Sequence, residues 1–125
     1  RGKADVTNMW GPLNGPGWRE NDPYINAAKL RGTKIYITSG TGIPGKHDQI
    51  DYIHDLNDAF FWSDRYVAGG FIEAVTNQCT HQMVDRLHQL KIPVTVNYRP
   101  TGTHSWGYWE DDLHTTWPKI ERDLQ

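Results

Sequence analysis

Two short β-like runs separated by a long amphipathic segment constrain the fold of this chain more than any other feature. Residues 34–39 and 93–98 are rich in β-branched and aromatic side chains, which favour strands. Between them, apolar residues recur every three or four positions from about Phe71 to Leu90, the spacing of an amphipathic helix. A strand–helix–strand connection of this length predicts parallel strands, and parallel sheets are covered by helices on both faces. The sequence therefore predicts an α/β fold.

The strand count limits what these residues can form alone. Two strands do not make a stable parallel sheet, so the pattern needs more strands than these 125 residues supply. The chain also starts at Arg1 without an initiator Met or an apolar signal region, as the interior of a longer protein would. We therefore expect residues 1–125 to be about half of a larger α/β domain.

The remaining segments have weaker patterns. Residues 1–23 are rich in Gly and Pro, which predicts an ordered loop without regular elements, anchored by tryptophans. The Asn-Asp-Pro sequence at 21–23 predicts a short helix that ends near Leu30. Residues 43–65 are expected to be helical in part. A last helix is expected from Ser105 onward, interrupted at Pro118. That helix carries Trp106, Trp109, Leu113 and Trp117.

Composition excludes several classes of protein. Hydrophobic residues make up 37% and aromatic residues 12%, which is too much for a disordered tail. Thirteen basic and 15 acidic side chains give a net charge of −2, so we expect no binding to nucleic acid or to anionic membranes. No apolar run reaches the roughly 20 residues of a transmembrane segment. Six tryptophans favour a protein that handles sugars, lipids or partner surfaces.

Cysteine and histidine usage predicts neither a disulfide nor a metal site. The single Cys79 excludes an internal disulfide and a cysteine-based zinc site, and its place on the apolar face of the expected helix predicts inert packing. The pairs His47/His54 and His81/His88 each lie seven residues apart, but no metal-binding motif accompanies them. We expect no metal and no other cofactor.

His104 is the strongest candidate for chemistry. It follows the second expected strand directly, in a glycine-containing loop before a helix. Ligands and catalytic groups collect at the carboxyl ends of strands in open α/β sheets. An imidazole in such a loop can serve as a general base, because it titrates near neutral pH. A surface or capping histidine is the alternative interpretation.

Two acids could orient this histidine, and the residues alone leave the choice open. Asp48 lies in the loop after the first expected strand, whereas Glu73 lies in the first turn of the long helix. A catalytic histidine usually needs such a carboxylate to fix its tautomer and stabilise its cation. Either acid could instead be solvated, and an acid in a first turn also interacts favourably with the helix dipole.

The sequence lacks a recognisable nucleophile. No Gly-x-Ser-x-Gly elbow occurs, because none of the three candidate serines has both glycines: Ser39, Ser63 and Ser105. The triad of α/β-hydrolases runs in the order Ser, acid, His along the chain. A segment with only the acid and the histidine is what the C-terminal part of such an enzyme would contain. We expect the nucleophile in an N-terminal half that this chain lacks.

Three segments, at residues 9–23, 34–44 and 102–109, together resemble the antigen 85 mycolyltransferases. Met-Trp-Gly-Pro at 9–12, followed by Trp-Arg-Glu-Asn-Asp-Pro at 18–23, resembles the stretch that opens this part of the family. Lys-Ile-Tyr-Ile at 34–37 with the turn at 40–44 resembles the strand and glycine-rich turn that come next. The Gly-Thr-His-Ser-Trp-Gly-Tyr-Trp block at 102–109 is similar to a specific family block. The resemblance spans essentially the whole chain and is nearest to the corynebacterial members.

The resemblance implies the C-terminal portion of an α/β-hydrolase fold with a Ser–Glu–His triad and no large lid. It implies transfer of a mycolyl chain between trehalose monomycolates, or onto arabinogalactan, by a secreted protein of the cell envelope. The family's histidine falls on His104 and its acid on Glu73, while related esterases carry the acid where Asp48 stands. Ser105 and Trp106 match residues beside the sugar site. The stretch from His47 to Gly70 is longer than the family's usual connection.

Two other functions compete with the acyltransferase. A carboxylesterase of the same superfamily would hydrolyse the ester instead of transferring it. A non-catalytic, Trp-rich module that binds carbohydrate or matrix is the alternative from a different class. Because the nucleophile is absent, we expect the 125 residues alone to be inactive, with the missing N-terminal half or another copy of the chain as partner.

Overall fold

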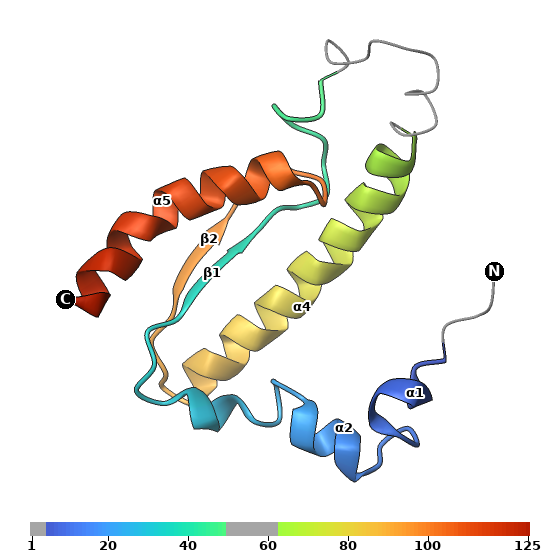
Figure 1. Ribbon diagram of the computed structural model, residues 1–125, viewed down its shortest axis with the longest axis vertical. Helices are drawn as coiled ribbons and strands as arrows, with labels where there is room; N and C mark the ends of the chain where they lie inside the picture. Colours follow the sequence, from blue (N-terminus) through green and yellow to red (C-terminus); the bar gives the residue numbers. More distant parts are fainter. Residues whose placement is uncertain (1–4, 50–62) are drawn as a thin grey trace.

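The computed structural model describes residues 5–49 and 63–125. Strand β1 (Tyr36–Ser39) and strand β2 (Thr95–Tyr98) pair in parallel, with Tyr36 opposite Thr95 and Ser39 opposite Tyr98. Helix α4 (Gly70–Gln89) makes the crossover between them, so the expected parallel pair is confirmed. Figure 1 shows α4 along one face of the sheet and α5 (Trp106–Leu124) along the other. Each strand begins two residues later than the sequence predicts.

The apolar core lies between the C-terminal part of α4 and the sheet. Leu87 and Ala27 are fully buried and Ile92 is 2% exposed, and these three side chains form one apolar cluster. Partly buried apolar residues of both strand segments pack against the cluster: Ile35, Ile37 and Val94. The packing fixes the C-terminal part of α4 against the sheet. It leaves the N-terminal part of the helix beside the carboxyl ends of the strands.

The N-terminal segment contains regular elements that the sequence analysis excluded. Helices α1 (Thr7–Trp10) and α2 (Pro16–Asn21) form here, so the expectation of a loop without regular structure is wrong. Pro16 stands at the first helical position, where a missing N–H breaks no hydrogen bond. The expected tryptophan anchor is present. The rings of Trp10 and Trp18 meet edge to face at 5.0 Å, and Trp18 Nε1 donates to the Gly11 carbonyl at 2.9 Å.

The helix expected up to Leu30 is only a 3₁₀ turn, η1 (Ala27–Leu30). Asp22 precedes this 3₁₀ turn in the chain. Its Oδ1 accepts hydrogen bonds from the backbone N–H groups of Tyr24 and Ile25, at 2.8 and 3.2 Å. These local bonds close a turn instead of starting an α-helix. The helical region expected within 43–65 falls mostly on residues 50–62, which lie outside the described residues.

Helix α4 begins and ends within one residue of the expected bounds, after a π-helical turn, η3 (Arg65–Gly69). Its apolar stripe is covered only in its C-terminal half, where Val84 and Leu87 are buried. Ile72 and Val75 are exposed, and so is Cys79. The expectation that Cys79 packs in a core is therefore wrong, because its part of the stripe faces away from the described core.

Helix α5 continues through Pro118 to Leu124, so the expected interruption does not occur. Pro118 removes one N–H donor from the helix, but it lies on the exposed side, where water can satisfy the freed carbonyl. Apolar side chains of α5 are exposed as well, with Leu113 at 56% and Trp117 at 51%. Together with the open stripe of α4, these residues leave a large apolar surface without cover from the described residues.

Candidate functional site

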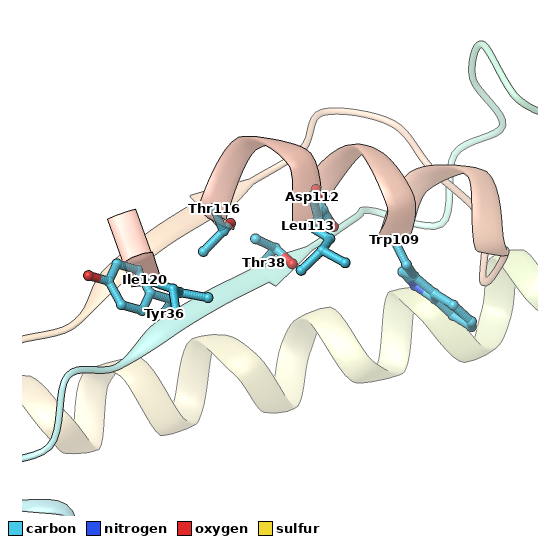
Figure 2. Close-up of a pocket in the computed structure, with 7 residues that line it drawn as sticks. All are labelled: Tyr36, Thr38, Trp109, Asp112, Leu113, Thr116 and Ile120. Atoms are coloured by element: carbon cyan, nitrogen blue, oxygen red, sulfur yellow. The ribbon is translucent and has the colours of Figure 1, made fainter. Parts of the chain in front are cut away.

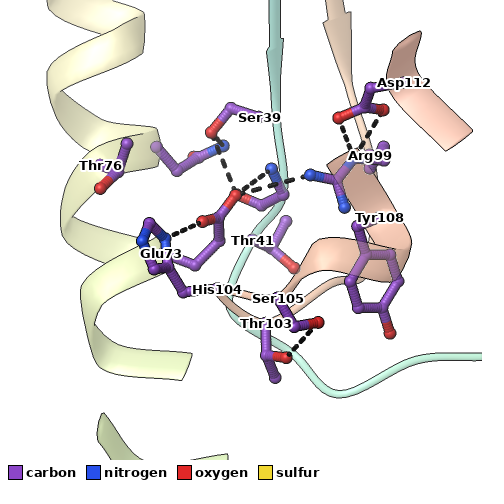
Figure 3. Close-up of polar contacts among 12 residues, drawn as sticks. Ser39, Thr41, Glu73, Thr76, Arg99, Thr103, His104, Ser105, Tyr108 and Asp112 are labelled. Atoms are coloured by element: carbon purple, nitrogen blue, oxygen red, sulfur yellow. Dashed lines mark hydrogen bonds and ion pairs between the residues drawn. The ribbon is translucent and has the colours of Figure 1, made fainter. Parts of the chain in front are cut away.

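His104 and Glu73, 31 residues apart in sequence, meet at the carboxyl end of the sheet. His104 Nδ1 lies 3.0 Å from Glu73 Oε2 (Figure 3). Glu73 belongs to the first turn of α4 and is 3% exposed, whereas 41% of the His104 side chain is exposed. The imidazole therefore has one nitrogen held by a buried acid and one edge open to a ligand. A histidine that acts as general base needs this arrangement.

The second carboxylate oxygen of Glu73 has partners of its own. Oε1 accepts a hydrogen bond from the backbone N–H of Gly40 at 2.8 Å and lies 3.6 Å from Arg99 Nη2. A buried carboxylate is costly unless it is paired and hydrogen-bonded. Here the end of β1, the end of β2 and the His104 loop all contribute a partner. The acid is therefore fixed from three sides.

The glycine-rich turn after β1 explains how these segments come together. Gly42 has a φ of +86°, and its N–H donates to the Gly102 carbonyl at 2.9 Å. A Cβ at position 42 would overlap the carbonyl oxygen of Gly70, the first residue of α4. Only glycine lets the turn lie directly on the start of α4 in this conformation. The contact places the Glu73 turn next to the loop that carries His104.

Asp48 occupies a different position from the one expected of a triad acid. It is 2% exposed, and its carboxylate accepts hydrogen bonds from the Tyr108 hydroxyl at 2.5 Å and the Thr103 hydroxyl at 2.7 Å. The Gly45 N–H and Arg65 Nε each donate to it at 2.9 Å. The structure thus brings Asp48 to residues that flank the imidazole and not to the imidazole itself.

The environment of Asp48 keeps that carboxylate charged. Burial opposes ionisation, but the hydrogen bonds from Tyr108, Gly45 and Thr103 and the charge of Arg65 outweigh it and hold the pKa of Asp48 below its usual 3.8. Burial and the bond to Asp48 raise the pKa of Tyr108 to about 12. At neutral pH, Tyr108 is therefore a neutral donor to an anionic Asp48.

Ser105 and Trp106, the other expected site residues, line a hollow with His104. The hollow has a volume of about 530 Å³. Trp106 is 75% exposed, and Ser105 Oγ accepts a hydrogen bond from Arg65 Nη2 at 3.0 Å. Trp109 supports both rings, because it meets His104 at 4.8 Å and Trp106 at 5.0 Å between ring centroids, edge to face. The lining residues are Asp64, Arg65, Gly69, Ile72, His104, Ser105, Trp106 and Gly107.

A second hollow lies between β1 and α5, with a volume of about 310 Å³ (Figure 2). Its lining is mostly apolar and carries a single acid, Asp112. The lining residues are Tyr36, Thr38, Trp109, Asp112, Leu113, Thr116 and Ile120. Among the described residues, no histidine and no nucleophile other than threonine or tyrosine hydroxyls lines it, so the hollow beside His104 is the better candidate for chemistry.

Sequence reasoning missed two groups that hold the site. Arg99 directly follows β2 and reaches Glu73, and Arg65 joins Asp48 to Ser105. Neither belongs to a motif, and a basic residue at the end of a strand is common. The one signal for these arginines is that each lies near a buried acid. That burial and that proximity cannot be recognised before the fold is known.

Two further findings concern metals and membranes. In the part of the chain that the structure describes, no three His, Cys, Asp or Glu side chains gather as they would around a metal ion. His47 binds Asp111 at 2.7 Å and His81 stacks on Tyr98, while His54 lies outside the described residues. Over residues 5–49 and 63–125, no helix has the length and apolar character needed to cross a membrane.

Comparison with known proteins identifies similar sequences. No family model matches the chain. It is 28% identical to the diacylglycerol acyltransferases/mycolyltransferases Ag85C and Ag85B of Mycobacterium leprae (strain TN) and to Ag85A of Mycobacterium tuberculosis (strain ATCC 25618 / H37Rv). Each alignment covers 98% of this chain and 33 or 34% of the relative, so the chain spans about a third of their length. The resemblance inferred from the motifs is confirmed.

The buried Asp48 carboxylate predicts a pH-dependent contribution to stability. A depressed pKa in the folded state stabilises the fold above the unfolded-state pKa, and the stabilisation is lost as the pH falls through the folded-state value. Asp48→Asn should therefore lower the free energy of unfolding by about 2 kcal/mol at pH 7 and flatten the loss of stability below about pH 4. Urea unfolding of the complete gene product that contains this chain, followed by circular dichroism between pH 3 and pH 7, measures both effects.

Glu121→Gln is the control for this prediction, because it makes the same chemical change at an exposed position of α5. It should change the free energy of unfolding by no more than about 0.5 kcal/mol at any of these pH values. If the Asp48 and Glu121 variants behave alike, the Asp48 network does not stabilise the fold.

Proposed function

We propose that this chain carries the acid–base half of a Ser–Glu–His acyltransferase of the mycolyltransferase kind. The observation that carries the proposal is the 3.0 Å contact between His104 Nδ1 and the buried Glu73 carboxylate, at the carboxyl end of parallel strands. The similarity to diacylglycerol acyltransferases/mycolyltransferases supports the same reaction class. His104 and Glu73 are the catalytic residues of the proposal. Asp48 supports the loop that carries His104, because it binds both Thr103 of that loop and Arg65.

The proposed reaction has two steps. In the first, His104 Nε2 accepts the proton of a serine hydroxyl as the serine oxygen attacks the ester carbonyl, and the imidazolium then protonates the leaving sugar oxygen. In the second, the imidazole accepts the proton of an acceptor hydroxyl as the acceptor oxygen attacks the acyl-serine carbonyl, and the imidazolium then protonates the departing serine oxygen, which restores the serine hydroxyl. Glu73 holds the Nδ1 proton throughout and stabilises the imidazolium. It does not itself gain a proton.

The nucleophile of this proposal lies outside the 125 residues, in the other part of one α/β-hydrolase domain. Three observations support it: within the described residues the sheet has two strands, these residues leave apolar side chains of α4 and α5 exposed, and the chain matches about a third of its relatives' length. The 125 residues alone would then have no turnover. The proposed partner is the N-terminal half of the same domain.

The hollow beside His104 suits a glycolipid substrate. The exposed Trp106 offers a flat face for a sugar ring, and the Ser105 hydroxyl lies next to it. Ile72 of α4 adds an apolar side chain to the lining of the hollow, and its neighbour Phe71 is exposed as well. We assign trehalose mycolate or a related glycolipid as the substrate, which places the protein in the cell envelope, outside the cytoplasmic membrane.

The first prediction of this assignment concerns His104. In the complete gene product that contains this chain, His104→Ala should lower kcat/KM for an activated acyl ester at least about 1000-fold, because proton transfer to and from the serine is lost. Release of p-nitrophenol from a p-nitrophenyl ester measures the rate. His114→Ala, an exposed histidine of α5, is the matched control and should retain the rate. Equal rates in the two variants would exclude His104 as the base.

The second prediction separates the transferase from its alternatives. With trehalose present, the complete protein should form acyl-trehalose, detected by mass spectrometry, in preference to the free acid. Trp106→Ala should raise KM for trehalose about tenfold while leaving ester cleavage in water within about threefold, since in this proposal the exposed indole meets the sugar and not the reacting ester. Free acid as the only product would identify a carboxylesterase. Trehalose binding without any turnover would identify a binding module.

A further inference from the structure

Arg99 lies between two buried carboxylates at the end of β2. Its Nε is 3.0 and 3.1 Å from the two carboxylate oxygens of Asp112 on α5, and its Nη2 is 3.6 Å from Glu73 Oε1 (Figure 3). Only 13% of the Arg99 side chain is exposed, and its backbone N–H donates to the Ser39 carbonyl at 2.8 Å. The guanidinium thus joins α5 to the acid that holds His104.

The surrounding chain is shaped around this guanidinium. Gly102 has a φ of +129°, and a Cβ there would overlap Arg99 Nη1. The Tyr108 ring also faces the guanidinium, with the Arg99 Cζ 5.0 Å from the ring centroid. Arg99 Nη1 is buried and forms no hydrogen bond to any atom of the described residues. These contacts hold the guanidinium in one position, and they leave Nη1 without a hydrogen bond to the described residues.

The charges around the pair come from four elements. Glu73 lies on α4, His104 on the loop after β2, Arg99 at the end of β2 and Asp112 on α5. Nearby, Asp48 accepts hydrogen bonds from both Arg65 and Tyr108, and Asp64 lines the hollow beside His104. With His104 neutral, Arg99 faces two carboxylates. Without the Arg99 cation, the two carboxylates would favour protonation of His104 more strongly.

We propose that Arg99 is a positioning residue for His104, which fixes the Glu73 carboxylate and offsets its negative charge beside the imidazole. This inference rests on the proposed acyl transfer. Arg99 touches neither substrate nor nucleophile in this scheme, and it acts only through Glu73. Asp112 in turn positions Arg99.

The test is the pH dependence of kcat/KM in the complete gene product, measured with a p-nitrophenyl ester between pH 5 and pH 9. Arg99→Met removes the cation but keeps a side chain of similar length. The acid limb of the profile, where kcat/KM falls as the pH is lowered, should therefore shift to higher pH by about one unit. The deficit should then be about tenfold at pH 6 and shrink toward pH 9. Arg99→Lys keeps the charge and should hold the limb within about 0.3 units of wild type.

Asp112→Asn supplies a second, oppositely signed readout. It removes a nearby anion, so the acid limb should move to lower pH, whereas Arg99→Met moves it to higher pH. Circular dichroism shows whether each variant folds. If Arg99→Met does not fold, the other two variants test the inference. It is supported if the acid limb shifts to lower pH in Asp112→Asn and stays in place in Arg99→Lys, and it is overturned otherwise.

The outcomes separate this inference from the proposed function. Activity that does not depend on His104 would contradict the proposed function. If activity depends on His104 but the Arg99 and Asp112 variants lower the rate equally at every pH, Arg99 is only structural and the inference is overturned. Shifts of opposite sign in the two variants support it.

Discussion

A buried carboxylate at the start of α4 imposes the main constraint on this structure. Glu73 is almost fully buried, and an ionised acid in that position is stable only with several well-placed partners. The partners come from His104, Gly40 and Arg99, which belong to three segments distant in sequence. The hydrogen bonds and ion pairs that the Glu73 carboxylate needs therefore fix how the strand ends, the glycine-rich turn and the histidine loop meet.

The two acids that the sequence could not separate have different environments. Glu73 contacts the imidazole directly, while Asp48 receives four donors from the loop and turns around it. A carboxylate with so many donors is a rigid anchor, and its depressed pKa reflects those donors. Asp48 thereby holds Thr103 and Tyr108, which lie on either side of His104 in the chain.

Local pattern predicted the elements that pack against one another. The two strands, their parallel pairing and the bounds of α4 followed from β-branched runs and a repeat of three and four residues. The short helices at residues 7–21 were missed, because Gly and Pro also occur at helix ends and first positions. The exposure of Cys79 was missed as well, since an apolar stripe does not say what covers it.

The candidate site was only partly predictable for a similar reason. His104 and its two possible acids could be located from their places after strands and in a first turn, and Trp106 from its distance to His104. Arg99 could not, because its significance depends on a carboxylate that becomes buried only when α4 packs against the turn. Interactions that exist only after long-range packing leave no periodic trace in the sequence.

The claim that Glu73 is the acid of the catalytic pair is tested most directly by comparing two isosteric variants. In the complete gene product, kcat/KM for an activated ester is measured for Glu73→Gln and Asp48→Asn, at a temperature where both remain folded. The structure predicts a loss of at least about 100-fold for Glu73→Gln, as expected when the partner of the imidazole is neutralised, and no more than about tenfold for Asp48→Asn. The reverse order would show that Asp48 is the acid and would contradict the account.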